Sequence, residues 1–98
     1  MNATPGTRIF NHGDMANPEH FGTITAVVTD RWGTHITIRP DAEAEREPYT
    51  VSLGMLSNEY KGHGGTRIVP LTAYEAWRAK QIEELTRHCK ETPDHDKA

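Results

Sequence analysis

Cysteine is almost absent from this 98-residue chain, in which Cys89 is the only one. A lone cysteine cannot form an internal disulfide, and small secreted domains usually depend on several. No run of about 18 apolar residues occurs, which excludes a transmembrane helix. The first residues also lack the basic and apolar regions of a secretory signal. We therefore expect a reduced, cytoplasmic protein.

An excess of positive charge is also missing. Eleven Lys and Arg residues stand against fourteen Asp and Glu residues, so the formal net charge is −3 with histidine neutral. Proteins that bind nucleic acid mainly through its phosphates normally carry a basic excess. The acidic residues concentrate in segment 41–47, where Arg46 is the only basic residue. This segment is expected to be a solvated loop, and the overall balance argues against a general polyanion binder.

The residues that are present fit one small domain with short strands. Hydrophobic residues make up 35% of the chain, enough for a thin core in a domain of this length. Turn-forming residues separate five strand-like runs, which are predicted at 7–10, 21–29, 34–39, 49–53 and 66–71. In the second run the alternation places Ile24, Ala26 and Val28 on one face.

A single helix is predicted over residues 72–91. Thr72 and Glu75 have the spacing of a capping box, with Thr72 as the N-cap. One apolar face follows at helical spacing, formed by Tyr74, Trp77, Ile82, Leu85 and Cys89. Pro93 stops the helix. The sequence therefore predicts one domain over residues 1–91 and a disordered tail over 92–98.

The order of these elements favours a small closed barrel, because closure removes most strand edges. The segment Pro5-Gly6-Thr7-Arg8-Ile9, with Gly13, Gly22-Thr23-Ile24 and Val27, resembles the opening of a KOW or Tudor-type module. Those modules belong to the SH3-like barrels. The resemblance implies a mainly β fold, a five-stranded SH3-like barrel followed by one C-terminal α-helix.

A second resemblance lies near the predicted start of the helix. The segment 65–75 is similar to the last strand and exit turn of the plasmid-type dihydrofolate reductases, SH3-like barrels of which four build a central pore. Their pore-lining motif is Val-Gln-Ile-Tyr, and this chain has Thr66, Arg67, Ile68 and Val69 at the corresponding positions. The glutamine and tyrosine that contact substrate in that family are absent. The similarity therefore supports the fold and weakens the case for the activity.

No group of residues has the spacing of a catalytic or metal centre. His12, Asp14, Glu19 and His20 fall in one loop, but no cysteine lies near them, and they are interpreted as turn formers and solvated side chains. His88 and Cys89 point about 100° apart on a helix, which disfavours a nucleophile–base pair. The glycines of segment 62–65 lack the Lys-Ser/Thr ending of a phosphate-binding loop. We expect no catalytic residue, no metal and no cofactor.

Trp32 is the strongest candidate for a binding residue. The turn Asp30-Arg31-Trp32-Gly33 links two predicted strands, and a large aromatic side chain there either contacts a partner or covers apolar residues. With His35 and Tyr60, Trp32 could line a binding groove. Alternatively, the indole folds back over the open end of the barrel. Both interpretations stay open on the sequence alone.

Arg39 and Arg67 are the candidates for binding an anionic partner. They could converge on one side of a barrel with three other basic residues, Arg8, Arg31 and Lys61, although no basic cluster occurs in the sequence. The favoured function is a non-catalytic small-barrel module that binds a protein partner, typical of a phage or plasmid accessory protein. The alternatives are a nucleic-acid-binding KOW/Tudor-like module and an oligomeric pore enzyme like the plasmid-type reductases.

Overall fold

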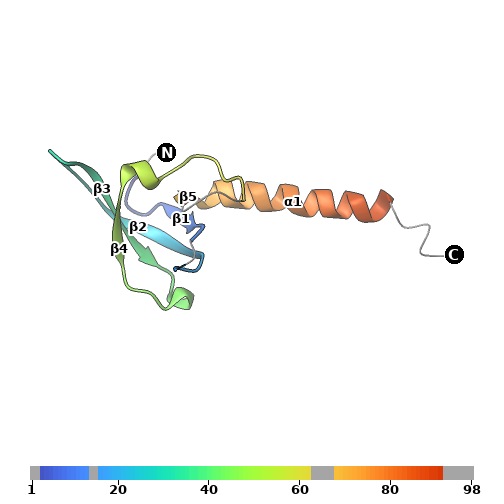
Figure 1. Cartoon of the computed structure of the whole chain (residues 1–98), viewed down its shortest axis with the longest axis horizontal. Coiled ribbons are helices and arrows are strands. Elements are labelled where there is room, and N and C mark those ends of the chain that lie inside the picture. The colour runs from blue at the N-terminus through green and yellow to red at the C-terminus, as the bar shows by residue number, and fades with distance from the viewer. Residues whose placement is uncertain (1–2, 14–15, 63–67, 92–98) are drawn as a thin grey trace.

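The computed structural model describes residues 3–13, 16–62 and 68–91, with side chains as far as Arg87. The five strands are β1 (Arg8–Asn11), β2 (His20–Asp30), β3 (Gly33–Pro40), β4 (Tyr49–Ser52) and β5 (Ile68–Pro70), and the α-helix is α1 (Leu71–Glu91) (Figure 1). Two short 3₁₀-helices, η1 (Ala42–Ala44) and η2 (Leu53–Met55), precede and follow β4. The mainly β fold with one C-terminal helix, expected from the sequence, is confirmed.

The strands form one antiparallel sheet in the order β4-β3-β2-β1-β5. Among the described residues no ladder joins β4 to β5, so the sheet is open and the expected closed barrel is not seen. After β4 the chain turns through η2, and a single parallel bridge between Leu56 and Ile68 brings it back to β5. The edge strands β4 and β5 are therefore not paired with each other, and only the segment after η2 joins β5, at this one bridge.

A β-bulge in β2 changes the face that its later side chains occupy. The pairing of β2 with β3 shifts between Ile24 and Ala26, because one extra residue is inserted there. Ile24 is buried and Val27 packs against the same core, whereas Val28 is exposed. The strict alternation predicted from the sequence is therefore wrong beyond Ile24.

The sheet separates two apolar clusters, and adjacent residues of β1 and β5 face opposite clusters. The first cluster lies on the face of the sheet that is turned away from α1. It is formed by five isoleucines, Ile9, Ile24, Ile36, Ile38 and Ile68. The second lies between the sheet and α1 and is formed by Phe10, Tyr60 and Val69, with Ala73, Tyr74 and Trp77 packed against it. Burial on both faces makes β1 and β5 the structural link between the sheet and the helix.

The helix begins at Leu71, directly after Pro70 at the end of β5. Thr72 is thus the second helical residue, and its prediction as N-cap is wrong. Since proline needs no backbone N–H partner and its fixed φ suits the approach to a helix, Pro70 allows the strand to pass into the helix without a loop. The last helical residue, Glu91, agrees with the predicted end.

Only the first two turns of α1 pack on the body of the protein. Tyr74 and Trp77 contact the second cluster, whereas Ile82 and Leu85 are 52% and 66% exposed. Beyond Trp77 the helix extends away from the sheet (Figure 1). The predicted apolar face is therefore only partly used in packing. No helix in the described part of the chain is long and apolar enough to cross a membrane.

Candidate functional site

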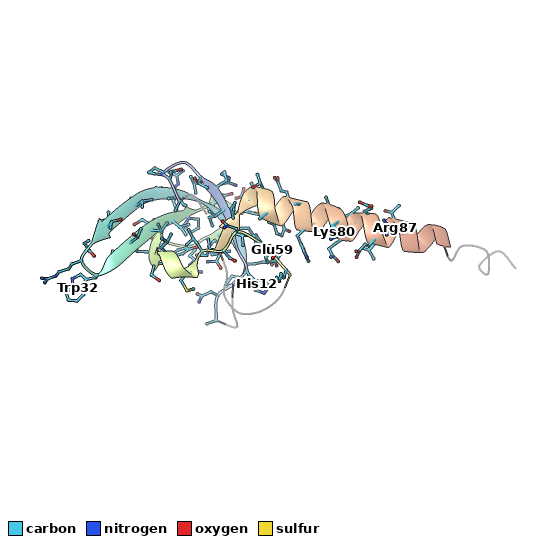
Figure 2. The ribbon with its side chains drawn as sticks, turned by 90° about the horizontal axis from the view of Figure 1, so that it is seen from above. His12, Trp32, Glu59, Lys80 and Arg87 are labelled. Carbon is cyan, nitrogen blue, oxygen red and sulfur yellow. The ribbon has the colours of Figure 1, made fainter. Side chains whose placement is uncertain are left out.

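Trp32 lies at the tip of the β2–β3 hairpin, and its side chain is 75% exposed. The strand β1 pairs with β2 only as far as Thr23, so the last residues of β2 continue with β3 alone. Figure 2 shows Trp32 at one end of the molecule and the helix that carries Lys80 and Arg87 at the other. The alternative in which the indole covers apolar residues is therefore wrong.

The backbone that carries Trp32 is held by Asp30. The Trp32 backbone N–H donates to Asp30 Oδ1 at 2.7 Å, and His35 Nε2 lies 3.2 Å from the same oxygen. The hydrogen bond from Trp32, together with the weaker one from His35, lowers the pKa of Asp30 below its ordinary value. Gly33 has a φ of 122°, a conformation that only glycine adopts readily. The turn is therefore well defined although it is exposed.

A cation lies against the indole. The Arg31 guanidinium carbon is 4.8 Å from the centroid of the Trp32 ring, within the range of a cation–π contact. The tip thus presents an aromatic ring with an arginine stacked on it, and His35 is close by through its contact with Asp30. Of the residues predicted for the binding surface, Trp32 and His35 are thus linked through Asp30.

Tyr60 does not belong to this surface, which corrects the predicted groove. It is only 8% exposed, and its ring contacts Phe10 at 5.3 Å and Trp77 at 4.9 Å between centroids. Its hydroxyl is 2.8 Å from His12 Nδ1. Burial raises the pKa of Tyr60. This side chain fills the space between the sheet and α1, because the segment after η2 lies along the first turns of the helix.

Of the four described basic candidates, only Arg8 and Arg39 lie on the same part of the surface. The Arg8 guanidinium forms a two-pronged ion pair with Asp41, at 2.6 and 2.7 Å, and Lys61 lies 4.0 Å from a Glu59 oxygen. Arg31 is at the hairpin tip. Arg39 is exposed on β3, and Arg67 lies outside the described residues. Arg8 and Arg39 are the two cross-strand neighbours of Thr23 and both act on Asp41, so this pair lies on one face of the sheet, whereas Arg31 and Lys61 lie elsewhere.

His12 and His20, at the two ends of the loop between β1 and β2, have structural partners. His20 Nδ1 is 3.1 Å from the Pro18 carbonyl, which can only accept, so Nδ1 carries the proton and Nε2 accepts from the Tyr49 hydroxyl at 2.8 Å. Asn11 donates to that hydroxyl at 2.9 Å. The described residues contain no group of three potential metal ligands, and Asp14 lies outside them. The prediction that His20 is solvated is wrong, because it is 6% exposed.

A pocket between β2, the β3–β4 loop and α1 was missed by sequence reasoning. It has a volume of about 230 Å³, and its walls combine aromatic rings with carboxylates and one imidazole, from Phe10, Phe21, Tyr74, Glu19, Asp41, Glu43 and His20. These residues come from four segments that are distant in the sequence. The acidic composition of segment 41–47 was the one signal that pointed to this region.

The Arg8–Asp41 ion pair beside this pocket predicts a pH dependence. The hydrogen bond from Arg8 holds the pKa of Asp41 below its ordinary value of 3.8. Stabilisation from the pair is thus present above pH 3.8 and is lost as the pH falls through the lowered pKa. In urea melts between pH 6 and 2, the wild type should lose more stability than Asp41→Asn. Parallel losses in the two proteins would contradict this assignment.

Comparison with protein-family models, with curated proteins and with solved structures gives no match for this chain.

Proposed function

We propose that the protein is a non-catalytic interaction module that binds a protein partner, with Trp32 as the central contact residue. The observation that supports this most is the exposed indole on a turn held by the Asp30 carboxylate. Leaving a side chain of this size in water forgoes a large apolar burial. A protein surface that covers the indole would recover that free energy.

The fixed turn makes Trp32 suited to binding. A side chain on a preorganised backbone loses little conformational entropy when a partner covers it. Tryptophan and arginine are the residue types that most often dominate the energy of protein interfaces, and here Arg31 lies on the ring of Trp32. His35, tied to Asp30, would sit at the edge of the same contact surface.

Charge favours a protein over a nucleic acid as the partner. The chain has a formal net charge of −3, and two of its candidate phosphate-binding side chains, Arg8 and Lys61, lie beside carboxylates. Phosphate contacts normally dominate the affinity for nucleic acids, and they need cations that are free to make them. A KOW/Tudor-like module that binds nucleic acid through Arg39 and Arg67 is the second proposal.

The same proposal includes the assignment of this mainly β fold to the SH3-like barrels. The strand order, the long β2 with its bulge and the 3₁₀-helix between β4 and β5 support a relationship to the SH3-like barrels. An accessory role in a phage or plasmid is part of the same proposal. The pore enzyme is the third proposal. It requires an assembly of several chains, so a monomeric mass by light scattering would eliminate it.

Site-specific photo-crosslinking tests the role of Trp32. We expect a benzoylphenylalanine placed at position 32 to form covalent adducts with one protein in cells that naturally contain the chain. Excess wild-type protein should suppress these adducts, and Trp32→Ala should fail to do so. Because the indole is exposed, Trp32→Ala should change the free energy of unfolding by less than about 0.5 kcal/mol.

The matched control is the same crosslinker at Ala79, an exposed position on α1. Identical adducts from positions 32 and 79 would indicate non-specific contact and contradict the proposal. Adducts of position 32 with nucleic acid alone would favour the second proposal instead. A large loss of stability in Trp32→Ala would show that the ring is part of the core.

A further inference from the structure

The pocket between β2, the β3–β4 loop and α1 combines an aromatic wall with an acidic rim. Its wall is a cluster of three rings in which Tyr74 stacks on Phe10 with centroids 4.0 Å apart. Phe21 meets Tyr74 edge-on at 5.5 Å and is 37% exposed. The ring surface is therefore accessible on one side and firmly backed by the core on the other.

The rim carries more negative charge than its neighbours neutralise. Asp41 is paired with Arg8 at 2.6 Å. Glu19 and Glu43 line the same pocket, and neither forms a close ion pair with another described residue, although Arg8 acts on Glu43 and Arg39 acts on Asp41 over a longer range. Glu43 lies in η1, within the acidic segment 41–47. Three carboxylates thus face two guanidinium groups, and a cation in the pocket would find Glu19 and Glu43 without a close ion-pair partner.

We propose that this pocket binds the guanidinium group of an arginine side chain on a protein ligand. The electron-rich faces of aromatic rings attract cations, and the attraction grows where water is partly excluded. A guanidinium is planar, stacks on aromatic rings and donates hydrogen bonds in a fork that matches a carboxylate. The volume of about 230 Å³ accommodates this group and part of its aliphatic stem.

The pocket is a second site, separate from the hairpin tip. None of the residues that line it belongs to the turn Asp30–Gly33. Its ligand chemistry follows from its own rings and carboxylates, and it does not depend on the proposed role of Trp32. The two sites can therefore be tested separately in one protein.

An NMR titration with a single amino-acid probe tests the pocket directly. Nα-acetyl-arginine amide is added to ¹⁵N-labelled protein, and Nα-acetyl-citrulline amide serves as its uncharged analogue of nearly the same shape. We expect saturable shifts of the Phe21 and Tyr74 amides with arginine, with a Kd on the order of 10 mM, the weak binding typical of one side chain. Citrulline should bind at least about fivefold more weakly, because it lacks the charge.

Charge-removal variants provide the second arm of this test. The double variant Glu19→Gln/Glu43→Gln removes two exposed carboxylates and should weaken arginine binding about fivefold while preserving the fold. Glu75→Gln/Glu84→Gln removes the same charge from exposed positions on α1 and should bind arginine like the wild type. Trp32→Ala should also bind like the wild type, which separates a failure of this site from a failure of the hairpin tip.

Three results would overturn the proposal. The first is an absence of shifts at Phe21 and Tyr74 with the arginine probe. The second is equal binding of arginine and citrulline, which would show that charge is irrelevant. The third is equal binding of Nα-acetyl-lysine amide, which would mean that the pocket attracts any cation and has no preference for the planar guanidinium.

Discussion

Replacing Phe10 with alanine is expected to reduce the free energy of unfolding by about 3–5 kcal/mol, the usual cost of removing a fully buried phenylalanine. Phe10 is 2% exposed and lies at the centre of the aromatic cluster. Its ring stacks on Tyr74 at 4.0 Å and meets Tyr60 edge-on at 5.3 Å. Few domains of this size exceed the lower part of the usual 5–15 kcal/mol range, so this loss should leave a substantial unfolded population.

Phe21 provides a matched control for this substitution. It is the cross-strand partner of Phe10 in the β1–β2 ladder and contacts the same Tyr74 ring, but it is partly exposed. Phe21→Ala should therefore cost much less than Phe10→Ala. Urea unfolding followed by circular dichroism and by Trp77 fluorescence measures both, with Trp32 changed to phenylalanine to remove its signal. Similar losses in the two variants would contradict the placement of Phe10 as the link between sheet and helix.

The fold class could be predicted because its signals are local. The strands appear as short apolar runs between turn residues, and the helix as one long amphipathic segment that ends at Glu91. The bulge in β2 could not be predicted, since an inserted residue leaves no mark in a run that reads Thr-Ile-Thr-Ala-Val-Val. The exposure of Ile82 and Leu85 could not be predicted either, because periodicity shows an apolar face and not how far the packed surface extends.

The candidate site was predictable only where its residues lie close together in the sequence. Trp32 and His35 belong to one hairpin, so their proximity follows from the turn between them. Tyr60 reaches α1 through a contact with Trp77, and the pocket joins β1, β2, the β3–β4 loop and α1. Such contacts between distant segments depend on the complete packing. Whether Trp32 is covered also depended on where β1 stops pairing with β2, which no local pattern encodes.

Gly13→Ala is the second substitution expected to have a large effect, because two separate constraints act on this glycine. Its φ is 79°, and an alanine in this conformation costs about 1–2 kcal/mol. An added Cβ would also lie 2.5 Å from the Asn17 carbonyl oxygen and 2.7 Å from the Glu19 nitrogen. These are backbone atoms of the returning loop, which cannot move aside as a flexible side chain would.

The total cost of Gly13→Ala should therefore clearly exceed that of the left-handed conformation alone. The Gly13 N–H donates to Asn11 Oδ1 at 2.8 Å. The side-chain Nδ2 of Asn11 donates in turn to the Tyr49 hydroxyl, which is also the hydrogen-bond partner of His20. Moving the loop would disturb this buried network. It would also displace Glu19 from the rim of the pocket between β2, the β3–β4 loop and α1. Arginine binding should therefore weaken as the free energy of unfolding falls.

Gly6→Ala is the control that separates the two constraints. Gly6 also has a positive φ, 94°, but no atom lies within 4 Å of the position that its Cβ would occupy. We expect Gly6→Ala to cost only the conformational part, about 1–2 kcal/mol, and Gly13→Ala to cost measurably more in the same urea titration. If the two variants unfold at the same urea concentration, the loop does not press against Gly13, and the position of Glu19 at the pocket loses its structural support.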